Sequence, residues 1–127
     1  MANGCYDLIH NGHLRLIKHA KTLGNTLILA VDSDRRVAEL KGSMRPINKA
    51  MDRKEFLECI KGVALVVEFD TEQELEKWIK KLDVDILVVG SEYRGRKVVG
   101  GDLVKEVVYF DRIPGYSSTS IIEGNNY

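Results

Sequence analysis

Apolar residues along this chain fall into two alternating kinds of segment. Four apolar runs have the length of strands, at residues 26–31, 63–69, 85–89 and 106–110. Between them, apolar residues recur every three or four positions, which is the spacing of one helix face. Unbroken β-rich runs are typical of strands covered on both faces. We therefore expect buried strands at 26–31 and 63–69, the first of them central or nearly so, and further strands at 85–89 and 106–110.

The helical segments carry recognisable start and stop signals. The helix that begins near His13 has an apolar stripe, and Gly24 is expected to end it. At residues 71–82, Thr71 and Glu74 have the spacing of a capping box, and Trp78 lies on the apolar stripe, which predicts a core role for it. Two further helices are expected, a short one capped by Ser33 and one from about Ala50. The core residues predicted for the latter are Phe56, Leu57 and Ile60.

Strands that alternate with helices in this way indicate βαβ units and a parallel sheet. We predict an α/β fold, a Rossmann-like doubly wound parallel sheet of about five strands, in a single domain spanning residues 1–127. The first strand departs from the pattern, because only Met1 and Ala2 supply apolar residues before the glycine turn. Either this strand is very short, or the natural protein begins upstream of Met1, and the sequence leaves both open.

Composition narrows the range of partners. The chain carries 19 basic and 19 acidic side chains, so no overall field favours nucleic acid or a membrane surface as a partner. Cys5 and Cys59 are too few and too irregularly placed for a disulfide framework or a zinc site, and this predicts a cytoplasmic protein. No apolar stretch reaches membrane-spanning length, and the N-terminus shows no signal-peptide pattern.

A turn rich in glycine and histidine stands out at residues 3–21. Gly4 and Gly12 lack a Cβ, so we expect the backbone to turn sharply there and to bring N–H groups near a bound anion. A helix that begins between residues 11 and 13 places His13 at the positive end of the helix dipole, where a phosphate binds well. His10 and His13 could then both donate N–H bonds to a polyphosphate. Taken alone, the His-x-x-His spacing is also compatible with simple helix capping.

The full string Gly-x-Tyr-Asp-x-x-His-x-Gly-His at residues 4–13 resembles the HxGH motif of the cytidylyltransferase-like nucleotidyltransferases. That family includes glycerol-3-phosphate cytidylyltransferase and the heptose-1-phosphate adenylyltransferase domain. The resemblance implies that His10 and His13 are catalytic groups that contact a nucleoside triphosphate. It also implies a nucleotide-binding turn made of Gly4, Tyr6, Asp7 and Gly12, in which Asp7 orients its neighbours.

Three segments after this turn also resemble the family. The sequence Lys-Gly-x-x-Arg-Pro at residues 41–46 is similar to the adenylyltransferase loop that closes over the triphosphate or the second substrate. This likeness implies a catalytic Lys41 and a substrate-binding Arg45. A Ser-Asp pair and an Asp-Arg pair, at 33–34 and 52–53, imply that Asp34 and Arg53 face the substrate or its phosphates.

The segment after the third of the four apolar runs resembles the family's contact with base and ribose. The residues that carry this likeness are Gly90, Glu92 and Tyr93, with Glu92 in place of a more usual aspartate. Arg94 and Arg96 follow in the densest cationic cluster of the chain and are candidates for the acceptor phosphate. A solvated loop is an equally good interpretation of this cluster.

The C-terminal segment is similar to the family's Arg-x-x-Gly-Ile/Tyr-Ser-Thr-Thr motif. This resemblance places Arg112 on the triphosphate as a catalytic group. It adds four nucleotide-binding residues, Tyr116, Ser117, Ser118 and Thr119. Hydroxyl residues before an apolar pair also suit the start of a helix.

These features predict transfer of a nucleoside monophosphate from ATP or CTP to a sugar- or polyol-phosphate, with release of pyrophosphate. ATP is favoured over CTP, Mg²⁺ is expected to accompany the triphosphate, no metal site made by side chains is expected, and a homodimer is predicted. Three alternatives stay open: a glycerol-3-phosphate cytidylyltransferase, an adenylyltransferase for a pantetheine or nicotinamide precursor, and a non-catalytic nucleotide-binding module.

Overall fold

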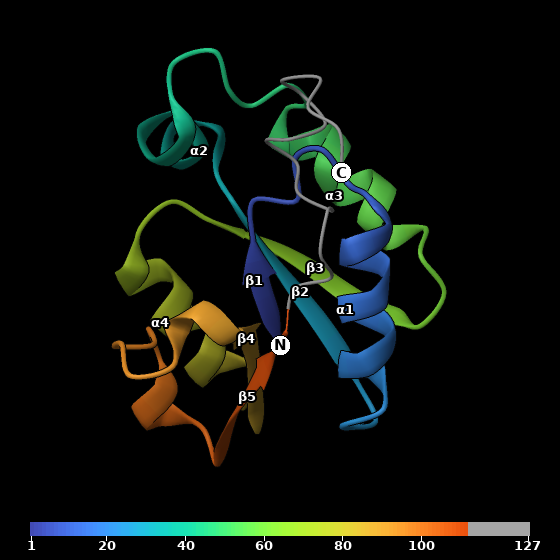
Figure 1. Cartoon of the computed structure of the whole chain (residues 1–127), viewed down its shortest axis with the longest axis vertical. Coiled ribbons are helices and arrows are strands. Elements are labelled where there is room, and N and C mark those ends of the chain that lie inside the picture. The colour runs from blue at the N-terminus through green and yellow to red at the C-terminus, as the bar shows by residue number, and fades with distance from the viewer. Residues whose placement is uncertain (112–127) are drawn as a thin grey trace.

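The computed structural model describes residues 1–111 and shows one parallel sheet with helices on both faces (Figure 1). Its strands are β1 (Ala2–Gly4), β2 (Leu27–Asp32), β3 (Val63–Phe69), β4 (Ile86–Gly90) and β5 (Glu106–Phe110). They lie in the order β3-β2-β1-β4-β5, and every neighbouring pair is parallel. The predicted α/β doubly wound sheet of five strands is therefore confirmed.

β1 is very short, yet it lies at the centre of the sheet. Ala2 pairs with Leu29 of β2 on one side and with Val88 of β4 on the other, and it is fully buried. The N-terminal ammonium of Met1 donates to the carbonyl of Ile86 at 2.7 Å, and the N–H of Val88 donates to the carbonyl of Met1 at 2.9 Å. Within this chain, three residues complete the ladder because both flanking strands are longer.

The helices cover the two faces of the sheet unequally. They are α1 (Asn11–Lys21), α2 (Asp34–Lys41), α3 (Ala50–Glu58) and α4 (Glu72–Lys81), with short 3₁₀ turns η1 (Ser91–Tyr93) and η2 (Gly101–Leu103). Helices α1 and α3 lie on one side of the sheet and α4 on the other (Figure 1). Successive β2 residues alternate accordingly, since Leu29 and Val31 join the core under α1 and α3 whereas Ala30 joins the core under α4.

Two predictions of burial were wrong. Residues 63–69 form the edge strand β3, and Leu65 is exposed, because no strand covers its outer side. In α3, Leu57 is fully buried but its neighbour Phe56 is 53% exposed. A helix that packs against an edge strand buries a narrower stripe than its count of apolar residues suggests.

The helix ends agree with the sequence in part. The Ser33 hydroxyl caps α2 by accepting from the N–H of Arg36 at 3.2 Å, as predicted. The Thr71 hydroxyl accepts from the N–H of Glu74 at 3.1 Å, but the Glu74 carboxylate reaches the N–H of Asp70 at 2.9 Å and not that of Thr71. The first helix ends at Lys21, before Gly24.

The core role predicted for Trp78 is confirmed with an added polar contact. Its ring packs partly buried against the core under α4, and its Nε1 donates to the carbonyl of Glu68 at 2.9 Å.

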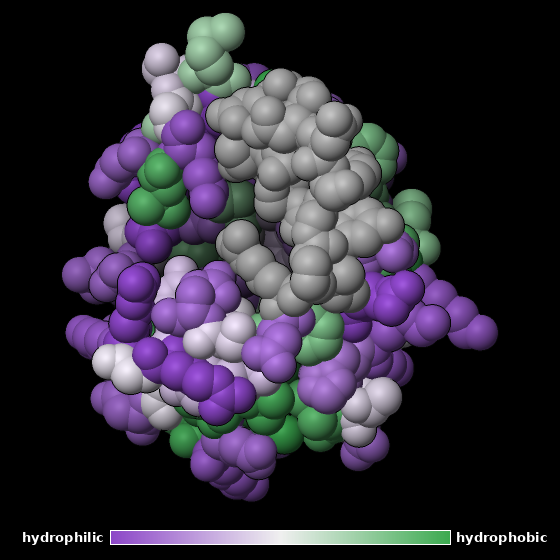
Figure 2. Space-filling model, viewed as in Figure 1, coloured by the Kyte–Doolittle hydropathy of each residue, from purple (hydrophilic) through white to green (hydrophobic). Residues whose placement is uncertain are grey.

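The surface of the described residues, viewed as in Figure 1, is largely hydrophilic, with smaller hydrophobic patches (Figure 2). Over residues 1–111, no helix is both long enough and apolar enough to cross a membrane.

Candidate active site

The candidate site lies at the edge of the sheet where its parallel strands end. Strands β1, β2 and β3 follow one another toward one side of the sheet, whereas β4 and β5 lie on the other side of β1. Ligands of such sheets bind outside the carboxyl ends of the strands, at the point where the strand order reverses. The connection from β1 to α1 and the segment after β4 both begin at this point.

The two histidines of the motif form a stacked pair at the start of α1. Their ring centroids are 4.0 Å apart, with 25° between the ring planes. His10 is the N-cap residue, and its Nδ1 accepts from the N–H of Gly12 at 3.0 Å. His13 reaches back, so that its Nδ1 accepts from the N–H of His10 at 3.1 Å. The pair is thus a capping box built from imidazoles.

This capping arrangement fixes the tautomer of both rings. An Nδ1 that accepts a hydrogen bond carries no proton, so the neutral imidazole holds its proton on Nε2. Both rings therefore have an Nε2–H donor beside the positive end of the α1 dipole. The predicted convergence of His10 and His13 is observed, and the helix-capping interpretation is also correct, because Nδ1 of each ring takes part in the cap.

The turn before the histidines is built differently from our expectation. Its left-handed residue is Tyr6, with φ of 54°, and neither Gly4 nor Gly12 has a positive φ. The Tyr6 side chain is buried, its hydroxyl donates to the carbonyl of Ala2 at 3.1 Å, and its ring lies 5.2 Å from that of His13. Burial, with the charge of Asp32 as a smaller cause, raises the pKa of this hydroxyl well above its ordinary value. Tyr6 thus stays neutral and supports the histidines.

Asp7 fastens the loop at residues 42–49 to the histidine turn. Its buried carboxylate accepts from the N–H of Ile47 at 2.7 Å and from the N–H of Asn48 at 2.9 Å. The Arg45 guanidinium completes the contact, with Nε 3.4 Å from the carboxylate and Nη2 donating to the Asp7 carbonyl. The structure therefore gives Asp7 the orienting part that the sequence suggested, and it engages Arg45 with Asp7.

Arg53 is a fully buried link between several chain segments. Its Nη1 donates to the carbonyls of Cys5 and Asp32, each at 2.8 Å, so it joins the ends of β1 and β2. Its Nε donates to the carbonyl of Asn48, and its Nη2 pairs with Asp34 at 2.9 Å. In this structure Arg53 supports the backbone of the site through these four contacts.

Asp34 has a similar structural role. Its Oδ1 accepts from the Arg53 guanidinium and also from the N–H of Ala50 at 2.8 Å, which ties the start of α2 to the start of α3. Lys41 lies exposed at the end of α2, near enough to Cys5 for its charge to act on the thiol. Neither residue is brought into hydrogen-bond contact with the histidine pair.

The segment after β4 borders the same edge of the sheet. Glu92 folds back over Gly90, so that a Cβ at Gly90 would meet the Glu92 carboxylate. Tyr93 is exposed at the end of η1. The Arg94 guanidinium lies 4.9 Å from the centroid of the Tyr109 ring, and Arg96 lies exposed on the loop that follows.

Five predicted residues lie outside the described range: Arg112, Tyr116, Ser117, Ser118 and Thr119.

Sequence reasoning missed Asp32, which ends β2 and accepts from Arg36 Nε at 2.6 Å and from the Cys5 thiol at 3.3 Å. An acid at the carboxyl end of a buried strand is a signal that could have identified it. Burial, followed by the charge of Asp32 and its hydrogen bond, raises the pKa of Cys5 to about 12.

The carboxylates at this edge are occupied by protein donors. Asp7 and Asp32 both bind an arginine, and each accepts at least one other hydrogen bond. Among the described residues, no group of three or more His, Cys, Asp or Glu side chains is placed to hold a metal ion.

Known proteins similar to this chain agree with the fold and the motif. Residues 1–124 match the family model described as cytidylyltransferase-like. The chain is 45% identical over 120 residues to the bifunctional protein HldE of Campylobacter fetus subsp. fetus, covering 94% of this chain and 26% of that protein. It is 46% identical over 123 residues to the bifunctional protein HldE of a Nitratiruptor species, covering 95% and 26%. The chain thus spans about a quarter of the length of these relatives.

A solved structure supports the fold. The lipopolysaccharide core biosynthesis protein from Thermoplasma volcanium GSS1 superimposes with a TM-score of 0.69, covering 87% of this chain and 93% of that one. The two sequences are 24% identical, so this likeness bears on the fold alone.

The doubly wound sheet and the histidine turn at its carboxyl edge place this chain among α/β proteins that bind ligands at the strand ends. The family match defines it further. The chain belongs to the cytidylyltransferase-like family of nucleotidyltransferases, as the motif at residues 4–13 predicted.

Proposed function

We propose that this chain transfers an adenylyl group from ATP to a sugar-phosphate and releases pyrophosphate. The observation that carries the proposal is the stacked pair of His10 and His13, in which each Nδ1 is held by a backbone N–H and each Nε2 carries a proton. Two imidazole donors at a helix N-terminus suit the α-phosphate of a nucleotide. Relatives named HldE, 41–46% identical to this chain, support the same assignment.

In the proposed reaction, an oxygen of the acceptor phosphate attacks the α-phosphorus. A new P–O bond forms there, the bond from the α-phosphorus to the oxygen bridging it to the β-phosphorus breaks, and pyrophosphate leaves with that electron pair. A phosphate monoester is mostly dianionic at neutral pH, so the acceptor needs no general base. The protein then contributes positioning and charge neutralisation, with His10 and His13 as donors and with Lys41 and Arg112 as added positive charge.

Mg²⁺ is proposed to enter with the triphosphate. Asp7 and Asp32 are each engaged with an arginine and with other protein donors, so we expect phosphate oxygens and water to supply most of its ligands. When bound, the ion would neutralise charge on the phosphates. Asp7 and Asp32 keep their roles as supports for the turn in this proposal.

The preference for ATP rests on two segments, the Lys-Gly-x-x-Arg-Pro loop at 41–46 and the region at 93–101, which resemble the heptose-phosphate branch of the family. The corresponding cytidylyltransferase branch uses CTP and glycerol 3-phosphate. Measurement of kcat/KM for ATP and CTP with the same acceptor separates the two. A clear preference for CTP would contradict the proposed adenylyl transfer.

The experiment that tests the function is a panel of nucleoside triphosphates with phosphorylated acceptors, read out as pyrophosphate release. Heptose 1-phosphate, a hexose 1-phosphate and glycerol 3-phosphate cover the acceptor classes. We expect release with ATP and a sugar 1-phosphate. Thermal stabilisation by ATP without release for any acceptor would instead favour the non-catalytic nucleotide-binding module.

We also propose a homodimer. The support from the structure is the exposure of two large apolar side chains on α3, Met51 at 79% and Phe56 at 53%. Light scattering at micromolar concentration should give twice the mass of the chain. A monomer under these conditions would refute the proposal.

A further inference from the structure

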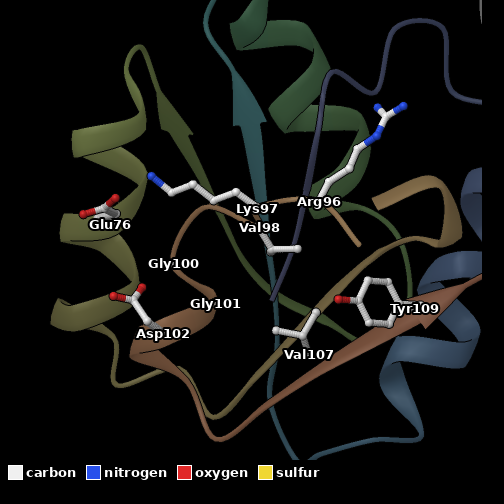
Figure 3. A pocket seen from close by; sticks show the side chains of 9 residues that line it. All are labelled: Glu76, Arg96, Lys97, Val98, Gly100, Gly101, Asp102, Val107 and Tyr109. Carbon is white, nitrogen blue, oxygen red and sulfur yellow. The ribbon is translucent and has the colours of Figure 1, made fainter. Parts of the chain in front are cut away.

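A hollow of about 400 Å³ lies beside β5, and neither His10 nor His13 lines it (Figure 3). Its walls come from α4, from the connection between β4 and β5, and from β5 itself. The lining residues with polar side chains are Glu76, Arg96, Lys97, Asp102 and Tyr109. Its volume is within the range of about 300–1,000 Å³ that is usual for small-molecule sites.

Four charged side chains line this hollow and lack partners within the described chain. The Glu76 and Asp102 carboxylates lie on one side, Lys97 extends toward Glu76, and the Arg96 guanidinium lies on the opposite side (Figure 3). None of these four side chains makes a hydrogen bond or ion pair with another described residue, unlike the arginines near the histidine turn. A ligand with an anionic end and a hydroxyl-rich end would satisfy both sides, because carboxylates accept hydrogen bonds from hydroxyls.

The hollow reaches the catalytic edge of the sheet. Tyr109 pairs with Val89, next to the last residues of β4 and β5, and Arg96 follows η1 at the same edge. In Figure 3 the Arg96 guanidinium points away from the two carboxylates, whereas the Tyr109 hydroxyl points into the hollow. A phosphate beside Arg96 would therefore be directed to the carboxyl edge, and the rest of the molecule would lie against Tyr109 and Asp102.

The backbone at the floor of the hollow is held rigidly. Gly100 has a φ of 80°, and a Cβ there would overlap Cδ1 of Ile79 in α4, so this segment packs directly on the helix. Gly101 adds a second position without a side chain, which keeps the backbone accessible to a small ligand. Such a preformed wall reduces the ordering cost of binding.

From these features we infer that the hollow binds the carbohydrate part of the acceptor, with its phosphate on the Arg96 side and its hydroxyls on Tyr109, Asp102 and Glu76. This inference rests on the proposed function, because it names the place where a sugar-phosphate acceptor binds. It assigns sugar recognition to residues other than the histidine motif. Glycerol 3-phosphate is too short to use the whole hollow and gains less from it.

The test uses Tyr109→Phe and Asp102→Asn, which remove a hydroxyl and a charge with little change in volume. Asp102→Asn should raise KM for heptose 1-phosphate about tenfold or more, the usual loss for a hydrogen bond to a charged group. Tyr109→Phe should raise it about fivefold, the usual loss for a hydrogen bond between neutral groups, and both variants should leave KM for ATP within about twofold. Asp83→Asn is the matched control, because Asp83 is exposed at the far end of α4 and its positive φ is tolerated by asparagine. Unchanged acceptor KM in both variants would overturn the inference.

A binding measurement keeps this test separate from the test of the function. Addition of heptose 1-phosphate to the wild type should shift the NMR signals of the Gly100 and Gly101 amides in a saturable manner. If they shift but no pyrophosphate is released with any nucleotide, the hollow binds sugar-phosphates and the proposed function fails. If pyrophosphate is released and these amides do not shift, the inference about the hollow fails and the function stands.

Discussion

The N–H of His10 donates to Nδ1 of His13 at 3.1 Å while the two rings stack 4.0 Å apart. One side of each imidazole therefore caps the helix, and the other side carries a proton at the edge where phosphate is expected. In the proposed function, helix capping and chemistry are thus joined in the same two residues. A variant at His13 can separate the two roles only if it keeps an acceptor for the His10 N–H and removes the imidazole.

The capping contact predicts how His13 affects stability. His13→Ala should lower the free energy of unfolding by about 1 kcal/mol, because it removes an acceptor at the helix start. His13→Gln should lose less, since glutamine at the same position is a usual member of a capping box. Urea unfolding of both variants measures the difference. Equal losses would mean that the capping contact is not formed in solution.

Arg53 is predicted to be a structural requirement of the site. Its guanidinium holds the ends of β1 and β2 together through two carbonyls and is fully buried. Arg53→Lys keeps the charge but loses most of these bonds, so it should cost about 3 kcal/mol of stability or more. The same substitution at exposed Arg15 on α1 is the control and should have little effect. Similar unfolding curves for the two variants would contradict the role given to Arg53.

Two glycines with the same backbone conformation allow strain and packing to be measured separately. Gly95 and Gly100 have φ of 76° and 80°, but only at Gly100 would a Cβ meet another residue, Ile79. Gly95→Ala should cost about 1–2 kcal/mol from strain alone. Gly100→Ala should cost a further 1–3 kcal/mol, roughly the penalty of overpacking. Equal costs, from chemical denaturation, would show that α4 moves to accept the methyl group.

The two cysteines should differ in reactivity. Burial and the neighbouring Asp32 raise the pKa of Cys5 to about 12, so its thiol stays protonated near pH 8, whereas Cys59 is exposed. Iodoacetamide at that pH should label Cys59 and spare Cys5 in the folded protein. The raised pKa stabilises the fold below the ordinary value of 9, and this contribution is lost as the pH rises from 9 toward 12. Equal labelling of both thiols would contradict the raised pKa of Cys5.

Periodicity was enough to predict most of the fold. The strand at 106–110 and the start of α1 appeared where the sequence placed them, because both depend on local patterns. The exposure of Leu65 could not be predicted, since an edge strand and a central strand have the same apolar run and differ only in their neighbours.

For the site, the sequence identified the histidines but not their support. The motif predicted that His10 and His13 converge, whereas the left-handed conformation of Tyr6 and the several bonds of Arg53 come from tertiary contacts with distant segments. From the sequence alone, a charged residue is interpreted as a ligand contact. Only its burial in the structure shows that it holds the backbone. Arg45 was also predicted to bind substrate, whereas in the structure it pairs with Asp7.

The central claim is that the histidine pair acts on a nucleotide during adenylyl transfer, and His13→Gln tests it most directly. The measurement is kcat for pyrophosphate release from ATP and heptose 1-phosphate, with circular dichroism and urea unfolding on the same samples. We predict release by the wild type and a loss of about a hundredfold or more in kcat for the variant, at nearly unchanged stability. A kcat close to that of the wild type, with the fold intact, would leave the motif as a helix cap and contradict the account.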